Sequence, residues 1–382
     1  MDAPGRIVLD ALGRAPAGPE LLAAAGGLPG VHLVGGAVRD LLLGSTPREL
    51  DVVVDGDPAP LLARLSAGAP GPATVHPRFA TATVTVPAGR IDVARSRRER
   101  YPIPGGLPEV EPAPLTDDLL RRDFTVNAIA VSLDAGELRA APGALGDLDA
   151  RRLRVLHDRS FVEDPTRLLR LARYRARLGF AVEPHTAGLA AAASLDGVSG
   201  ARVGAELRLA LLEPDPLAAL DGVRGLPVKI DAPVARRATQ LLPADGRVDL
   251  MILGILTRQV ATEAWLESLG LTARDRDVVR AVWGADRLAG AMAGAPSALH
   301  AALAREPVEA VAAAGALGPG EAARRWLEEL RHVRLEIRGE DLVGAGIPPG
   351  PDIGRRLART LGRKLDGELA GGRAAELESA LG

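Results

Sequence analysis

The chain has 382 residues, of which 47% are hydrophobic and 2% aromatic, and this length allows two or three domains with sizeable cores. Its formal net charge of −2 means that any contact with nucleic acid depends on local basic patches, such as those in residues 95–100 and 151–154. The absence of cysteine excludes disulfides, cysteine nucleophiles and thiolate metal sites.

The N-terminal residues predict a short helical lead-in over 1–17. They lack the basic start and long apolar core of a signal peptide. No apolar run approaches the roughly 20 residues that a membrane-spanning helix needs. We therefore expect a cytoplasmic protein without a membrane segment.

The next segment joins an apolar run at 31–34 to a glycine pair, Gly35 and Gly36, and then to a helix-like stretch with Arg39 and Asp40. Glycines before a helix start let a triphosphate lie against backbone N–H groups. The pattern alone is weak, because most such glycines only form turns. An ordinary surface arginine is the commoner meaning of Arg39 taken by itself.

A turn at 44–47 leads into a predicted strand with Glu49 and Asp51 two residues apart, so both side chains point to the same side. A divalent metal is the usual way to keep two carboxylates together. Asp92, in a predicted hairpin over 81–94, is the candidate third acid. In two-metal nucleotidyl transfer, acids hold two Mg²⁺ ions that activate the attacking hydroxyl and steady the leaving phosphates. The alternative is that these acids simply face water, which is common for a residue like Asp92.

Two further motifs combine acidic and basic residues. The stretch 121–130 places a doubled arginine beside Asp123, with Asn127 four residues later, and alone it indicates a local polar structure. In 161–180 an acid and three arginines recur every third residue: Asp164, Arg167, Arg170 and Arg173. Asp offers acceptors and Arg a planar fork of donors, so such a pair can bond the edge of a nucleobase. A salt-bridged amphipathic helix is the commoner meaning of this spacing.

The character of the chain changes after residue 147. Strand-like alternation becomes scarce, and helical spacing of apolar residues dominates from residue 168 onward. The sequence therefore predicts an α+β part followed by a long all-helical part. We expect three regions, namely 1–147, 148–225 and 226–382.

Taken in order, these motifs resemble the class II tRNA nucleotidyltransferase/poly(A) polymerase family, which includes the bacterial CCA-adding enzymes. LVGGAVRDLLLG resembles the family's nucleotide-binding loop, RRDFTVNAIA its second motif, and EDPTR its nucleobase-templating motif. Residues 198–212 are similar to a later neck motif, with Arg202 and Glu206 in the matching places. Residues 339–369 resemble a C-terminal segment of bacterial members.

The resemblance implies a polymerase-β-like nucleotidyltransferase head at 1–147, a helical neck with the base-recognition motif at 148–225, and a helical body and tail at 226–382 that bind tRNA. It places the metal-binding acids on Glu49 and Asp51, and Asp92 completes the predicted catalytic set. The family normally has Asp at both metal positions, so Glu49 departs from the pattern. The predicted nucleotide-binding set is Gly35, Gly36, Arg39, Asp40, Arg122, Asp123, Asn127, Asp164, Arg167, Arg170 and Arg173.

The implied function is template-independent addition of CCA to tRNA 3′ ends from CTP and ATP, with Mg²⁺ as cofactor. Alternatives are a poly(A) polymerase and a partial enzyme that adds only CC or only A. Low aromatic content weighs slightly against the polymerase, because single-strand RNA binders rely on base stacking. A segment after Arg100, where the family has a flexible loop tied to the switch to ATP, favours full CCA addition. Glu49 motivates a further alternative, a non-catalytic RNA-binding paralogue.

Overall fold

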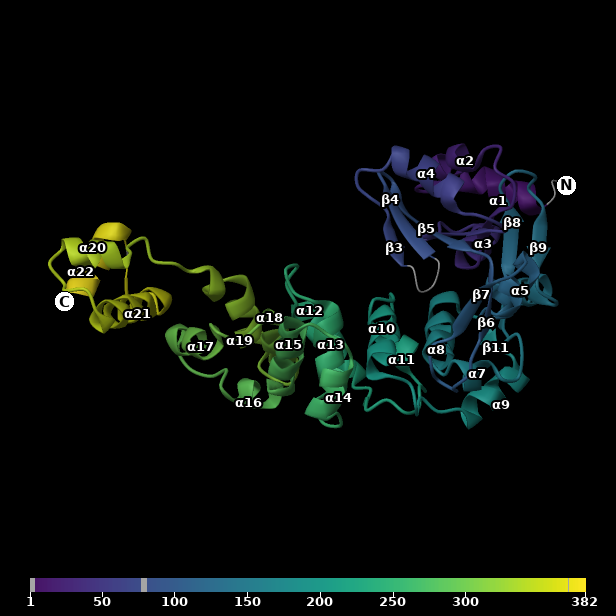
Figure 1. Ribbon diagram of the computed structural model, residues 1–382. Helices are drawn as coiled ribbons and strands as arrows, with labels where there is room; N and C mark the ends of the chain where they lie inside the picture. Colours follow the sequence, from purple (N-terminus) through teal and green to yellow (C-terminus); the bar gives the residue numbers. More distant parts are fainter. Residues whose placement is uncertain (1–3, 77–80, 370) are drawn as a thin grey trace. The chain divides into compact units, whose positions relative to one another are not determined.

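The computed structural model describes residues 4–76, 81–369 and 371–382, so residues 1–3 of the expected lead-in lie outside the described residues. The chain divides into two compact units (Figure 1). Unit 1 contains residues 1–206 and 213–225, and unit 2 contains residues 207–212 and 226–382. The division into three regions expected from the sequence stays a prediction.

Unit 1 is built on a seven-stranded sheet with the order β3-β4-β5-β2-β1-β8-β9. Within it β2 and β5 run parallel, and the other neighbouring pairs are antiparallel. The expected hairpin over 81–94 is confirmed as the pair β4 and β5. The strands are β1 (Val31–Val34), β2 (Leu50–Val54), β3 (Thr74–His76), β4 (Thr81–Val86), β5 (Gly89–Arg95), β8 (Ile129–Ser132) and β9 (Leu138–Ala140).

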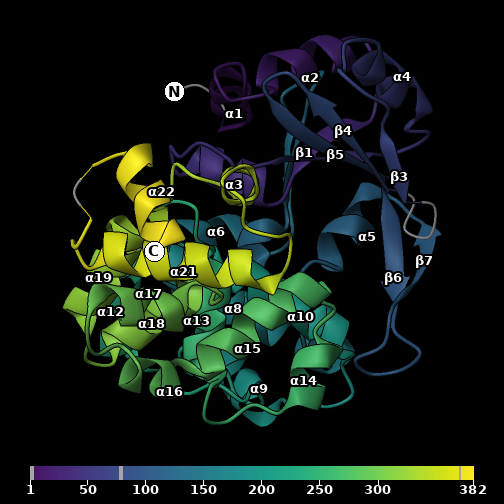
Figure 2. The same ribbon diagram turned by 90° about the vertical axis from the view of Figure 1, so that its left-hand side faces the viewer.

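Helices α1, α2 and α4 lie on one face of this sheet in both ribbon views (Figures 1 and 2). Their apolar side chains pack with Leu50, Val52 and Val54 of β2 in the main core. A smaller cluster on the other face joins Val53 of β2 to α5. The bounds are α1 (Pro4–Leu12), α2 (Gly18–Ala25), α3 (Gly36–Leu42), α4 (Ala59–Ala67), α5 (Leu115–Leu120), η2 (Thr125–Asn127) and α6 (Ala144–Asp149).

Because side chains alternate along a strand, the odd-numbered residues of β2 point away from the main core. Asp51 therefore lies on the face of the sheet that also carries Val53 and α5. On β5, Ile91 and Val93 belong to the main core, so Asp92 points to the same face as Asp51. The sheet thus separates these two acids from its largest apolar cluster.

The rest of unit 1 is a ribbon of two strands, a second short strand pair, and a set of helices that carries the predicted base-recognition motif. The ribbon comprises β6 (Arg97–Arg100) and β7 (Glu109–Pro112). Helix α8 ends where Gly179 adopts a left-handed conformation with φ 65°, which favours glycine. The remaining elements are β10 (Arg152–Leu153), β11 (Ala181–Val182), α7 (Ser160–Glu163), α8 (Arg167–Leu178), α9 (Pro184–Ala192), α10 (Gly200–Leu211) and α11 (Pro216–Leu220). Residues 207–211 of α10 belong to unit 2.

Unit 2 consists of helices, with no strand among its described residues. Helices α13 and α18 are buried along their lengths and form its centre. An α+β part followed by a mostly helical part is therefore confirmed. No helix in the described part of the chain has the length and apolar character to cross a membrane. The bounds are α12 (Ala232–Leu241), α13 (Val248–Thr257), α14 (Glu263–Ser268), α15 (Ala273–Trp283), α16 (Ala285–Gly290), α17 (Pro296–Leu303), α18 (Val308–Ala316), α19 (Gly320–Glu328), η3 (Leu330–His332), α20 (Gly339–Gly344), α21 (Pro351–Leu365) and α22 (Arg373–Leu381).

Candidate active site

The glycine pair forms the turn between β1 and α3. Gly35 has a φ of 71°, a conformation that residues with a side chain rarely adopt. A Cβ built on Gly35 would come within 2.7 Å of Nη1 of Arg122, so this guanidinium lies directly against the turn. The Nε of Arg122 is buried and has no hydrogen-bond partner among the described residues. A cationic group with an unused donor beside an open backbone turn is suited to an anion.

Two of the predicted catalytic acids are neighbours in the sheet. The parallel register of β2 and β5 pairs Asp51 with Asp92. Asp92 accepts a hydrogen bond from Oγ1 of Thr83 at 2.5 Å. Sequence alone suggested Asp92 as the third acid, and the register brings it beside Asp51.

Burial raises the pKa of Asp51 to about 6, and Glu49 and Asp92 add to the rise while Arg122 opposes it. Glu49 and Asp92 thus both act on the carboxylate of Asp51, which lies on β2 in the interior of the sheet. A nearby cation would stabilise the ionised form of Asp51 and lower this raised pKa.

Glu49 differs from the sequence expectation, because it lies in a bend before β2 and not on the strand. The ladder with β5 starts only at Leu50, which pairs with Ile91. Pro47, which lacks a backbone N–H, lies just before this bend. Glu49 is exposed, so its carboxylate has freedom that Asp51 lacks.

Carboxylate oxygens are the ligands that hard divalent cations prefer. Across the described residues, no three acidic or histidine side chains are grouped closely enough to hold a metal ion. The pair Asp51 and Asp92 supplies carboxylate oxygens on this face of the sheet. In phosphate-transferring enzymes Mg²⁺ is commonly bound by one or two carboxylates together with substrate phosphates.

Several predicted nucleotide contacts are instead paired with one another in a buried network behind the glycine turn. Arg39 is 1% exposed and donates to both Asp40 and Asn127. Asn127 donates to Asp123 at 2.9 Å, and Arg170 donates to the same carboxylate at 2.8 Å. Burial alone would raise the pKa of Asp123, but Arg170 and Asn127 hold it well below its usual range.

A tyrosine that the sequence did not single out lies at the centre of this network. The ring of Tyr174 faces the guanidinium carbons of Arg39, Arg170 and Arg173 at 5.2, 5.7 and 4.9 Å. Distances below about 6 Å allow cation–π attraction. The three arginines are thus ordered by an aromatic ring as well as by acids, and their nucleotide contacts stay a prediction.

The residues predicted to select the base lie where α7 leads into α8. Arg167 is 4% exposed and donates to Oγ of Ser160 at 2.6 Å and to the carbonyl of Arg121 at 2.8 Å. Asp164 lies in the short connection before α8 and accepts hydrogen bonds from Thr166 and Arg202. Both side chains are therefore held in defined orientations.

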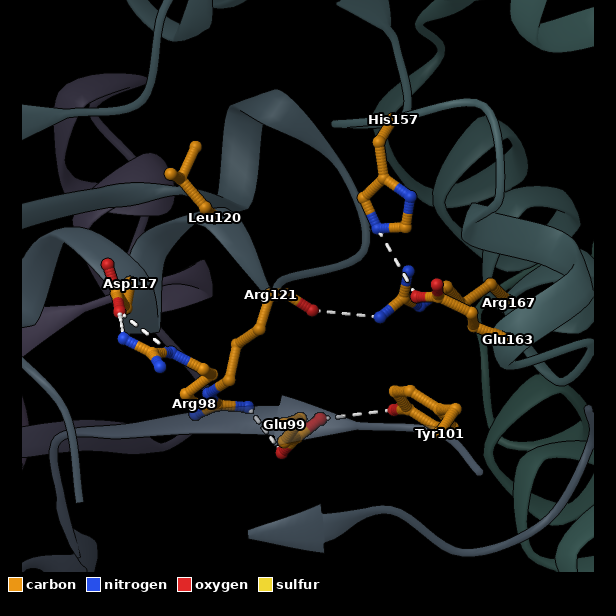
Figure 3. A pocket seen from close by; sticks show the side chains of 9 residues that line it. All are labelled: Arg98, Glu99, Tyr101, Asp117, Leu120, Arg121, His157, Glu163 and Arg167. Carbon is orange, nitrogen blue, oxygen red and sulfur yellow. Dashed lines mark hydrogen bonds and ion pairs between the residues drawn. The ribbon is translucent and has the colours of Figure 1, made fainter. Parts of the chain in front are cut away.

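A polar cavity of about 290 Å³ adjoins Arg167 (Figure 3). Its other charged groups are each paired: Arg98 with Asp117, Arg121 with Glu99, and Glu163 with Arg159 outside the lining. Because these charges are already balanced, the cavity presents little unpaired charge to a triphosphate. The nine residues that line it are Arg98, Glu99, Tyr101, Asp117, Leu120, Arg121, His157, Glu163 and Arg167.

Helix α10 supplies the second layer of this site. Glu206 accepts hydrogen bonds from Arg170 at 3.1 Å and from Arg173 at 3.3 Å. Arg202 reaches Asp164 with a distance of 2.7 Å. The pair Arg202 and Glu206, expected only from the resemblance of residues 198–212 to a neck motif, thus contacts the predicted base-recognition side chains.

Comparison with known proteins identifies the family. The family of the poly(A) polymerase head domain matches residues 31–154. A CC-adding tRNA nucleotidyltransferase of Deinococcus radiodurans is 37% identical over 345 residues, which cover 88% of this chain and 85% of that protein.

Solved structures agree with this match over nearly the whole chain. The apo form II of a CCA-adding enzyme is 30% identical with a TM-score of 0.75, covering 92% of this chain and 91% of that one. The Thermotoga maritima CCA-adding enzyme complexed with tRNA is 28% identical with a TM-score of 0.69, covering 92% and 90%. The chain therefore belongs to the class II tRNA nucleotidyltransferase/poly(A) polymerase family and is a nucleotidyltransferase whose sheet-containing head is followed by a mostly helical part.

Proposed function

We propose that this enzyme adds CCA to the 3′ ends of tRNA from CTP and ATP without a nucleic-acid template. The observation that carries the proposal is the face of the sheet on which Asp51 lies beside Asp92, within the electrostatic reach of Arg122 and its glycine turn. Acids beside an anion site are what transfer of a nucleotide from a triphosphate needs. The tRNA complex of the Thermotoga maritima relative supports tRNA as the partner.

In the proposed reaction the 3′-hydroxyl of the RNA attacks the α-phosphate of the nucleotide, and pyrophosphate leaves. Family membership implies a divalent metal, and we propose Mg²⁺ held by Asp51 with Glu49 or Asp92. When bound, it would lower the pKa of the attacking hydroxyl and balance charge on the phosphates. Arg122 and the Gly35–Gly36 turn would hold the triphosphate, which fixes the α-phosphate beside the acids.

Base selection is assigned to Asp164 and Arg167. The carboxylate of Asp164 is an acceptor for the amine of C or A, and the guanidinium of Arg167 is a donor to the neighbouring ring nitrogen. The helices of neck, body and tail would hold the tRNA acceptor arm through its shape and backbone phosphates. The regions 1–147, 148–225 and 226–382 would divide catalysis, base selection and RNA binding between them.

Addition of CC alone is the second candidate, because the Deinococcus radiodurans relative carries that name over 88% of this chain. Incubation with Mg²⁺, each labelled nucleotide and tRNA that lacks CCA, or ends in CC, separates the candidates. Full CCA addition predicts C on the first tRNA and A on the second. Long A tails on a primer that is not tRNA would favour a poly(A) polymerase, and no incorporation with any metal would contradict the enzyme proposed here.

Arg167→Ala is expected to reduce the preference for CTP and ATP over UTP and GTP by about tenfold, because a donor to the base is lost. Arg167 is buried, so the variant is also checked for folding by circular dichroism. Single-nucleotide incorporation rates measure the effect, with the exposed Arg98→Ala as the control. Unchanged selectivity in a folded Arg167→Ala protein would remove this residue from base selection.

Glu49→Asp is expected to raise the rate at a fixed Mg²⁺ concentration by severalfold. The shorter side chain restores the usual family residue, and Mg²⁺ tolerates little geometric error. Titration of Mg²⁺ and Mn²⁺ against rate measures the change, and Glu49→Gln serves as the uncharged control. A rate unaffected by either substitution would show that Glu49 is not a metal ligand.

A further inference from the structure

The carboxylate of Asp164 is held entirely through one of its two oxygens. Oδ1 accepts hydrogen bonds from the backbone N–H of Thr166 at 3.1 Å, from Oγ1 of Thr166 at 2.6 Å and from Nη2 of Arg202 at 2.7 Å. Among the described residues no group donates to Oδ2. The carboxylate is thus fixed in orientation and retains one free acceptor.

Arg202 contributes more to this arrangement than a single ion pair. Its Nη1 donates to the backbone carbonyls of Gly105 and Gly106 at 2.7 and 3.0 Å. Gly105 and Gly106 lie in the loop between β6 and β7. The N–H of Gly105 donates to the carbonyl of Glu163 at 3.2 Å, so this loop contacts the residue before Asp164. One planar guanidinium therefore donates both to the loop carbonyls and to the carboxylate of Asp164. The single ammonium group of a lysine cannot make this set of hydrogen bonds.

We propose that Arg202 is a specificity-determining positioning residue, which holds Asp164 so that Oδ2 faces the exocyclic group of the incoming base. The proposal rests on the proposed function. C and A carry an amine donor at this position, whereas U and G carry a carbonyl oxygen. A fixed carboxylate accepts from the amine and repels the carbonyl. A carboxylate free to rotate would turn away from U or G and lose the power to reject them.

The loop geometry offers a second way to disturb the same contact. Gly105 has a φ of 72°, and a Cβ there would lie 3.4 Å from the carbonyl group of Gly197. Gly105→Ala therefore strains the loop and shifts the carbonyl that Arg202 binds, without touching Arg202 or Asp164. Its effect on base choice is expected to have the same direction as that of Arg202→Ala, and to be smaller.

The experiment compares kcat/KM for CTP with UTP on tRNA lacking CCA, and for ATP with GTP on tRNA ending in CC, in the full chain. In Arg202→Ala the ratio of correct to incorrect nucleotide is expected to fall about tenfold, chiefly through better use of UTP and GTP. Arg202→Lys should restore only part of it. Arg208→Ala, an exposed arginine on the same helix, is the matched control and should keep the wild-type ratio.

An equal loss of kcat/KM for all four nucleotides in Arg202→Ala would reduce Arg202 to structural support and overturn the proposal. An unchanged ratio of correct to incorrect nucleotide in both Arg202→Ala and Gly105→Ala would also overturn the proposal. If Arg202→Ala does not fold, an unchanged ratio in Gly105→Ala and Arg202→Lys has the same consequence. Failure of the wild-type protein to transfer any nucleotide would instead refute the proposed function, and this proposal with it.

Discussion

Replacing Asp51 with Asn is expected to lower the rate of nucleotide transfer by about 1,000-fold, because an amide cannot supply the charge that a bound divalent cation needs. Asp51 pairs with Asp92 in the sheet and is the acid whose pKa is raised to about 6. Single-turnover incorporation of C into tRNA lacking CCA measures the loss. Asp134→Asn on the same unit is the control, because this acid is exposed and hydrogen-bonded only locally.

The same substitution is expected to stabilise the folded protein at neutral pH. The pKa of Asp51 is higher in the folded chain than its ordinary value of 3.8, so the folded state binds the proton more tightly than the unfolded chain. The ionised carboxylate therefore costs about 3 kcal/mol of stability above pH 6, and this cost fades as the pH falls toward 4. In urea unfolding, Asp51→Asn should be clearly more stable than the wild type at pH 8, about half as much so at pH 5, and only slightly at pH 4.

Loss of activity together with loss of stability at pH 8 would contradict this account of Asp51. It would mean that the ionised carboxylate is already stabilised by the fold and has no need of a cation. At subsaturating Mg²⁺ the rate of the wild-type enzyme is also expected to fall as the pH drops through about 6, because Asp51 must lose its proton before it can bind the cation.

Arg122→Ala is expected to lower kcat/KM for the nucleotide by about 100-fold, mainly through a higher KM, because the triphosphate loses its cationic contact. The guanidinium lies against Gly35 with its Nε unpartnered. Initial rates at varied CTP concentration measure the change. Arg122→Lys keeps the charge but not the planar fork, and should fall between the two proteins.

A second readout separates this role from simple support of the fold. Arg122 lowers the pKa of Asp51, so its removal should move the acidic limb of the rate profile to higher pH. Arg122 also pairs with the fully buried Asp118, which Arg121 still neutralises in the variant. A folded Arg122→Ala protein with an unchanged KM and an unshifted pH–rate profile would show that Arg122 neither binds the triphosphate nor lowers the pKa of Asp51.

The order of the elements and the chemistry of the motifs could be read from the sequence, because both depend on local spacing. The hairpin over 81–94 and the helical character after residue 168 follow from apolar periodicity. The register that places Asp92 opposite Asp51 could not be read, since it depends on a parallel pairing between strands 41 residues apart. For the same reason the sequence could not show that the pairing of β2 with β5 begins at Leu50 and leaves Glu49 outside the strand.

The arginine network shows a second limit of sequence reasoning. Spacing placed Arg170 and Arg173 on one side of a helix, but it could not show whether they face a nucleotide or acids of the same chain. Their partners, Asp123 and Glu206, lie 47 and 33 residues away along the chain. Tyr174 gave no signal at all, because a single aromatic residue in an amphipathic helix is an ordinary core residue.

The most direct test of the proposed function measures which nucleotides the wild-type chain adds to tRNA lacking its CCA end, with Mg²⁺ and CTP and ATP present together. Sequencing of the products is expected to show CCA at the 3′ ends and no longer tails. Asp51→Asn in parallel should leave the tRNA unextended. Products that carry no added nucleotide with the wild-type chain, or equal extension with Asp51→Asn, would contradict the proposed catalytic site.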